Sequence, residues 1–166
     1  MKIVIDTNIF VSSFLNPSGS PRAIIDLWKN GQVTLCLCAE ILSEYIDVLG
    51  RFRIPIVDLK NLLELFKSRH YMDFVAITGD LQAITADLED NKFVECALVS
   101  SAVCLVSGDK HLLSIGRYGM VEVMNATDFL ENVGRWKQSP ATDPKRRVRS
   151  GGGARRQSPL LHEDIY

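Results

Sequence analysis

Two aspartates stand where runs of apolar residues end. Asp6 directly follows KIVI and Asp109 follows VCLVSG, and both runs have the composition of buried strands. In open α/β sheets the functional crevice lies beyond the carboxyl ends of the strands, so an acidic side chain at each exit is a candidate for a site there. A turn or helix-cap aspartate is the alternative explanation for either residue taken alone.

Helix periodicity adds two further acids. In the amphipathic segment 39–49, Glu44 lies at the margin of the apolar stripe. In the segment after Asp90, the apolar face that begins at Phe93 projects backward onto Asp90, whereas Glu95 is predicted to point away from the core. For each residue taken singly, a solvated charge on a helix is the competing interpretation.

Taken together, these four carboxylates indicate a metal site. If they converged without a counter-ion, each close pair would repel by roughly 4 kcal/mol at an effective dielectric of about 20. Ligation by carboxylate and water oxygens suits Mg²⁺ or Mn²⁺ rather than zinc, and the chain has no lysine-containing phosphate loop as an alternative source of positive charge. The sequence therefore predicts a site for one or two divalent ions.

The cysteines do not suggest a structural zinc site. Cys36 and Cys38 lie two residues apart in a strand-like segment, and Cys96 and Cys104 stand singly in apolar segments. This spacing differs from that of tetrahedral zinc sites. We expect reduced thiols that act as small core residues.

Strand-like and helix-like segments alternate along most of the chain, which predicts an α/β fold, a three-layer αβα sandwich around a central parallel sheet. Ser20 followed by Pro21 is typical of a helix start, and Thr127 is the predicted cap of the last helix. The predicted strands are 2–5, 33–37, 74–77, 103–106 and 121–124, and the predicted helices are 9–15, 21–30, 39–49, 57–69, 91–101, 110–115 and 128–133.

Length and composition favour one globular domain. The chain has 166 residues, 46% of them hydrophobic, which is enough for one sizeable core. No apolar run is long enough to span a membrane, and the N-terminal MKIVID has no signal-peptide pattern. These features predict a cytoplasmic protein with no membrane partner.

The charge is unevenly distributed along the chain. Residues 1–134 carry 11 basic and 17 acidic side chains, a net of −6, whereas residues 135–166 carry 8 and 3, a net of +5. Apolar periodicity also stops at Gly134, and the remainder is rich in Pro, Gly, Ser and Arg. We predict a domain at 1–134 and a basic, flexible tail at 135–166, either a solvated extension or a segment that contacts RNA phosphates.

Four motifs occur in an order that resembles a known nuclease family. IDTNIFVS, the helix containing LSEYIDVL, DLEDNKFVECAL and LVSGDKHLL are similar to the successive motifs of PIN-domain ribonucleases, and most closely to the VapC-like toxins of toxin–antitoxin pairs. The similarity spans about residues 1–133. The tail lies outside it.

The resemblance places the family's acidic positions on the four carboxylates already identified: Asp6, Glu44, Asp90 and Asp109. It also matches Thr7, Asn8 and Ser107 to polar positions that would orient carboxylates or water, although ordinary strand-end capping is an equal explanation. The implied activity is Mg²⁺- or Mn²⁺-dependent hydrolysis of RNA, leaving 5′-phosphate and 3′-hydroxyl ends. The implied partners are an RNA substrate, a small antitoxin protein and a second copy of the chain.

Two positions qualify the resemblance. His111 stands where these toxins usually carry a second aspartate after Gly-Asp-Lys, and a surface position for it is favoured over a metal or substrate contact. Asp87 matches the first aspartate of an Asp-x-x-Asp pattern, where it either supports the site or caps a turn.

Other functional classes stay open at this point. A PIN-like domain without catalysis that binds RNA or a partner would share the motifs, and the His111 difference and the basic tail are compatible with it. Phosphatases of the haloacid-dehalogenase type require Asp-x-Asp after the first strand, where this chain has Asn8 as the third residue. Phosphoacceptor receiver domains require an acidic pair where this chain has Ile5-Asp6.

Overall fold

The computed structural model describes residues 1–82 and 88–138, and within them six strands form one sheet in the order β3-β2-β1-β4-β6-β5. All neighbouring strands are parallel except β5 and β6, which form an antiparallel hairpin at one edge. In chain order the elements are β1 (Lys2–Ile5), α1 (Thr7–Leu15), α2 (Ser20–Lys29), β2 (Thr34–Leu37), α3 (Ala39–Leu49), α4 (Ile56–Lys67), β3 (Met72–Phe74), α5 (Asn91–Val99), β4 (Cys104–Val106), α6 (Lys110–Ile115), β5 (Arg117–Tyr118), β6 (Val121–Met124) and α7 (Ala126–Gln138).

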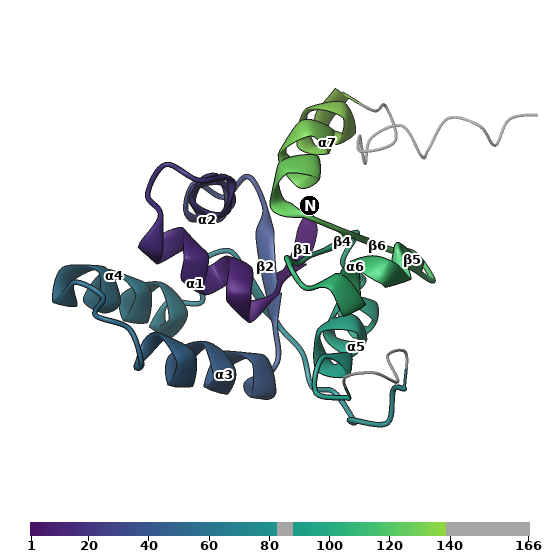
Figure 1. Ribbon diagram of the computed structural model, residues 1–166, viewed down its shortest axis with the longest axis horizontal. Coiled ribbons are helices and arrows are strands. Elements are labelled where there is room, and N and C mark those ends of the chain that lie inside the picture. Colours follow the sequence, from purple (N-terminus) through teal and green to yellow (C-terminus); the bar gives the residue numbers. More distant parts are fainter. Residues whose placement is uncertain (83–87, 139–166) are drawn as a thin grey trace, which may run out of the picture.

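Helices cover both faces of the sheet, so the predicted αβα sandwich is confirmed. α5 contacts β1, β2, β4 and β6, while α1 packs on α2 and α3, and α2 packs on α7. Figure 1 shows α1 to α4 on one side of the strands and α5 and α6 on the other. The central strand β1 is buried on both faces, with Ile3, Val4 and Ile5 at 0% exposure, as its continuous apolar run requires.

The strand order creates a topological switch point next to β1. The chain passes from β1 to β2 on one side and returns later to β4 on the other, so β1 and β4 flank the switch point of the sheet. Their register pairs Ile5 with Val106, which places the next residues of both strands side by side at the carboxyl edge. Open α/β sheets bind ligands at such a point.

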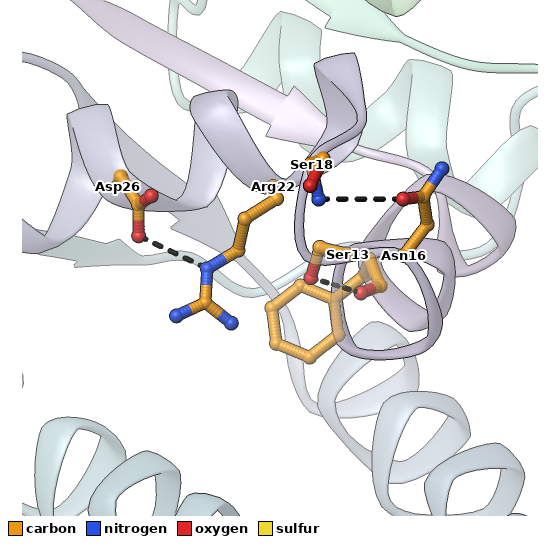
Figure 2. Close-up of polar contacts among 6 residues, drawn as sticks. Ser13, Asn16, Ser18, Arg22 and Asp26 are labelled. Carbon is orange, nitrogen blue, oxygen red and sulfur yellow. Dashed lines mark hydrogen bonds and ion pairs between the residues drawn. The ribbon is translucent and has the colours of Figure 1, made fainter.

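A network of local polar contacts forms the corner between α1 and α2 (Figure 2). The Ser13 hydroxyl donates to the Phe10 carbonyl at 2.6 Å, and the Ser18 N–H donates to Asn16 Oδ1 at 3.3 Å, an Asx turn that follows the end of α1. On α2, Arg22 Nε lies 3.2 Å from Asp26 Oδ1, a pair one helical turn apart. These contacts stabilise the end of α1, the turn after it and the first turns of α2.

Several predicted boundaries were wrong. α1 begins at Thr7 rather than residue 9, because Asp6 caps it, and Ser20 lies inside α2 with Gly19 at the N-cap position. α7 begins at Ala126, so Thr127 is not its cap, and it continues past Val133 to Gln138. The larger error is β3, predicted at 74–77, which lies at Met72–Phe74 because pairing with Leu35–Leu37 of β2 sets its register.

The four cysteines are free and fully buried, as expected for core residues. Burial raises the pKa of the Cys104 thiol to about 12, so this thiol stays protonated. None of the helices within 1–82 and 88–138 is long and apolar enough to cross a membrane.

Candidate acidic site

Asp6 is a buried carboxylate at the exit of β1. Its N–H still belongs to the sheet, donating to the Val106 carbonyl at 2.9 Å, while its side chain is 3% exposed. Oδ1 accepts the Asn8 N–H at 3.3 Å, which makes Asp6 the N-cap of α1. The capping alternative is therefore correct, but it explains neither the burial nor the second partner of this carboxylate.

That second partner is Ser107, which connects Asp6 to Asp109. The Ser107 hydroxyl is fully buried and donates to Asp6 Oδ2 at 2.7 Å. The same oxygen accepts the Asp109 N–H at 2.9 Å. Two acids 103 positions apart in the sequence are thus linked through one hydroxyl at the switch point.

Asp109 begins α6. Its Oδ1 accepts the His111 N–H at 2.7 Å and the Leu112 N–H at 3.3 Å, and its side chain is half-buried. His111 is exposed, in agreement with the predicted surface position, and its backbone contributes to the site by donating to Asp109.

The surroundings of Asp6 disfavour its charged form. Burial raises the pKa of Asp6 above its ordinary 3.8, the hydrogen bonds from Ser107 and Asn8 lower it, and the negative charges of Glu44 and Asp109 raise it further, with a net rise. Glu44 and Asp109 therefore both act on Asp6. Such a shift at the switch point of a sheet is a feature of functional sites.

Tyr45 positions Glu44. The Tyr45 hydroxyl donates to the carbonyl of Ile5, the residue before Asp6, and its ring stacks on Phe10 with centroids 4.0 Å apart. Burial raises the pKa of Tyr45 well above 10, so the hydroxyl keeps its proton and remains a donor. Because Glu44 directly precedes Tyr45, this anchor holds α3 against the exit of β1.

Glu44 itself forms an ion pair that the sequence did not reveal. Its Oε2 contacts Lys92 Nζ from α5, and the two side chains are 30% and 20% exposed. Asp90, the fourth predicted acid, is half-buried at the N-cap position of the same helix, and its carbonyl accepts the Phe93 N–H at 3.1 Å.

The three predicted polar neighbours differ in their surroundings. Ser107 is bonded to both aspartates, as described, and Asn8 is exposed and contributes its N–H. The Thr7 hydroxyl is buried and has no hydrogen-bond partner among the described residues. A buried hydroxyl normally has a partner, so this one fits a bound water.

The donor set matches a hard cation in chemistry. Carboxylate oxygens and hydroxyls are the ligands that Mg²⁺ and Mn²⁺ prefer, and the unpartnered Thr7 hydroxyl is consistent with a hydrated ion. In geometry, residues 1–82 and 88–138 contain no group of three His, Cys, Asp or Glu side chains arranged to hold a metal. Asp6 and Asp109 are linked through Ser107, whereas Glu44 is paired with Lys92.

Glu95 lies on a different side of its helix from the one that the sequence predicted. It was predicted to point away from the core, but it is 7% exposed and its Oε1 accepts the Thr78 N–H at 2.7 Å, the Thr78 hydroxyl at 2.9 Å and the Gly79 N–H at 3.2 Å. Burial raises the pKa of Glu95, but these hydrogen bonds outweigh it and the net pKa lies below 4.5. Glu95 anchors the chain after β3 to α5. Residues 135–138 of the predicted tail belong to α7, whereas Asp87 and residues 139–166 lie outside the described residues.

Glu44 also borders an open groove of about 500 Å³ along α3. Glu40 and Asp47 line it together with Glu44, and Arg51 is the basic residue of its lining. The groove thus continues the negative charge of the site along one face of the helix.

A mostly parallel αβα sheet with acidic side chains at the switch point between its two central strands defines a class of α/β domain built around a carboxylate site. Comparison with known proteins places the chain within this class: the family model for the PIN domain matches residues 2–111. The chain belongs to the PIN-domain family. The matched span includes Asp6, Glu44, Asp90, Ser107 and Asp109.

One relative is an uncharacterized protein of Methanocaldococcus jannaschii. It is 28% identical over 117 residues, which cover 69% of this chain and 75% of that protein. The similarity extends over most of both chains.

Proposed function

We propose that this protein is a metal-dependent ribonuclease that hydrolyses RNA phosphodiester bonds and acts as the toxin of a toxin–antitoxin pair. The observation that carries the proposal is the Asp6–Ser107–Asp109 linkage at the switch point of the sheet. Membership of the PIN-domain family supports a nucleic-acid substrate.

In this proposal Asp6, Glu44, Asp90 and Asp109 hold one or two Mg²⁺ or Mn²⁺ ions. A bound ion supplies an activated water and stabilises charge on the phosphate. Ser107 fixes the orientation of Asp6 by bonding Oδ2, and the His111 and Leu112 amides fix Asp109. Thr7 offers its hydroxyl and Asn8 its exposed side chain to water or substrate.

The charge distribution assigns different parts of the chain to the two partners. Residues 1–134 carry a net charge of −6, so the RNA backbone requires positive charge from the ions and from residues 135–166, which carry +5. An antitoxin would instead use the acidic surface, inserting arginine or lysine beside the carboxylates and along the α3 groove lined by Glu40, Glu44 and Asp47. Dimerisation is an expectation from the family resemblance.

The deciding experiment incubates the purified full chain with tRNA, rRNA and single-stranded DNA, in Mn²⁺ or in EDTA, and maps the ends of any fragments. We expect RNA cleavage only with metal, leaving 5′-phosphate and 3′-hydroxyl ends, and Asp109→Asn should abolish it. Cleavage that persists in EDTA would contradict the metal role. Metal-independent RNA binding without cleavage would instead identify a non-catalytic RNA-binding PIN domain.

A further inference from the structure

Lys92 brings a positive charge to the acidic site. It is the second residue of α5, its Nζ contacts Glu44 Oε2, and Glu44 acts electrostatically on Asp6. Lysine side chains usually extend into water, but only 20% of this one is exposed. The ammonium therefore lies within the site, between α3 and α5.

This position is unfavourable for a lysine in the absence of a partner. The first turn of a helix carries partial positive charge, which stabilises acidic side chains and disfavours cations. Partial burial of the side chain adds a desolvation cost. Glu44 offsets both effects, so each side chain of the pair holds the other in place.

The pair already occupies one of the four carboxylates. Glu44 Oε2 is bonded to an ammonium, and among the described residues no three acidic ligands are grouped. A divalent ion that takes Oε2 of Glu44 has to displace Lys92 from it. The ammonium and the ion would then compete for the same carboxylate oxygen.

We propose that Lys92 is an exchangeable counter-ion: it neutralises Glu44 while the site lacks metal, and when an ion binds it is released to contact a phosphate of the RNA. This inference rests on the proposed function. Lys92 is thereby a substrate-positioning residue that also lowers metal affinity.

Formal charges support the role of Lys92 in RNA binding. The four carboxylates carry about −4, and Lys92 brings the site to about −3. Two divalent ions would then leave the site at about +1 with Lys92 and at about zero without it. The first combination attracts a phosphodiester anion more strongly, and an ammonium with three donors is suited to a phosphate oxygen.

The test compares Lys92→Gln with wild type in two measurements on the full chain. Titration calorimetry of metal-free protein with Mn²⁺ alone should show roughly fivefold tighter binding in the variant, because no ammonium has to be displaced. Steady-state cleavage of RNA at saturating Mn²⁺ should show KM raised about tenfold with a smaller change in kcat. Loss of a purely structural lysine would not strengthen Mn²⁺ binding and weaken RNA binding at the same time.

Further variants separate the charge from the fold. Lys92→Arg keeps the charge and binds a carboxylate through two donors, so Mn²⁺ should bind no more tightly than to wild type, and KM should be largely restored. Lys92→Met keeps the packing of the aliphatic part of the side chain. It replaces Lys92→Gln if that variant has a lower melting temperature than wild type. Lys67→Gln breaks an exposed pair with Glu64, 3.0 Å apart on α4, and should change neither measurement.

Two outcomes overturn the inference: Mn²⁺ affinity that is unchanged or weaker in both Lys92→Gln and Lys92→Met, or a KM for RNA that matches wild type in both. Failure of the proposed function is distinguishable, because it would appear as absence of cleavage in the wild type itself. The Mn²⁺ titration then still decides whether Lys92 competes for Glu44.

Discussion

The Ser107 hydroxyl donates to Asp6 Oδ2 at 2.7 Å, although the two residues lie 101 positions apart in the chain. The bond exists because β1 and β4 are paired in parallel with Ile5 opposite Val106, so the residues that follow them meet at the same edge. Both side chains are buried, and the same hydroxyl accepts the Asp109 N–H. One oxygen therefore sets the geometry of two carboxylates.

Ser107→Ala should both destabilise the protein and weaken metal binding. The substitution leaves the Asp109 N–H without its acceptor and Asp6 without a donor that lowers its pKa, and unsatisfied buried groups cost about 1–3 kcal/mol. We expect a loss of that size in the free energy of unfolding, measured by urea denaturation, and weaker Mn²⁺ binding by calorimetry.

Ser13→Ala is the matched control for this prediction. Ser13 is also fully buried and donates to a carbonyl of its own helix at 2.6 Å, so its loss removes a hydrogen bond but touches neither aspartate. Its Mn²⁺ affinity should equal that of wild type. Equal Mn²⁺ affinities in Ser107→Ala and wild type would show that Ser107 does not orient the carboxylates.

Glu95→Gln should lower stability at neutral pH in a pH-dependent way. The ionised carboxylate accepts hydrogen bonds from Thr78 and Gly79, and the substituted amide would keep one acceptor oxygen, so we expect a loss of about 1–2 kcal/mol. Because the folded pKa of Glu95 is lowered, its stabilisation is present above the ordinary 4.5 and is lost as pH falls through the folded value. The difference in the free energy of unfolding between variant and wild type should therefore disappear in acid.

Urea denaturation at neutral pH and at about pH 3 measures this difference. Glu131→Gln, at an exposed position on α7, should leave stability within about 0.5 kcal/mol of wild type at both pH values. A difference for Glu95→Gln that stays constant in acid would mean that the charge of Glu95 does not stabilise the fold.

The sequence predicted the features that depend on short-range patterns. Alternating strand and helix segments indicated the αβα fold. Aspartates at strand exits indicated that acidic side chains gather at the carboxyl edge of the sheet, because strand burial and exit position are both visible in the local sequence. The two-residue strand β5 was missed since Arg117–Tyr118 is too short to show a period.

The features that were missed depend on contacts between distant segments. Helix phase placed Glu95 on the outer face of α5, but the chain after β3 packs on that face, so the helix is buried on more than one side. The Lys92–Glu44 pair joins α5 to α3 and follows from no local pattern. One signal was present: a lysine in the first turn of a helix next to Asp90 conflicts with the helix dipole, which indicates a partner.

Removal of the basic tail should weaken RNA binding without loss of the fold. Because α7 extends to Gln138, the truncation belongs after that residue rather than after Gly134. The deleted segment includes the cluster Lys145, Arg146, Arg147, Arg149, Arg155 and Arg156. If all six cations contact phosphates, the slope of log affinity against log salt should fall in magnitude by about 4 for single-stranded RNA.

Fluorescence anisotropy over a range of salt concentrations measures that slope, and thermal melting verifies the fold. A full-length variant with the six cations replaced by Gln separates charge from chain length and should behave like the truncation. An unchanged salt slope in both proteins would exclude the tail from RNA binding and leave it as a solvated extension.

Asp6→Asn tests the site through opposite effects on activity and stability. The metal-free wild type holds a carboxylate that is 3% exposed and faces Glu44 and Asp109, so the folded state disfavours its charge. Asparagine is as good an N-cap as aspartate, so the Asn8 contact does not offset the gain from removing the charge. We expect nuclease activity to fall by orders of magnitude, while the metal-free variant gains about 1–2 kcal/mol at neutral pH. Because the folded pKa of Asp6 is raised, wild type regains stability as pH falls through that pKa toward 3.8, so the gain should vanish in acid. Added Mn²⁺ should raise the melting temperature of wild type more than that of the variant.

Asp109→Asn is the matched control, since Asp109 also caps a helix but is only half-buried, and it should lose activity without the gain in stability. If metal-free Asp6→Asn is less stable than wild type, responds equally to Mn²⁺ and still cleaves RNA, Asp6 is a helix cap and the site lies elsewhere.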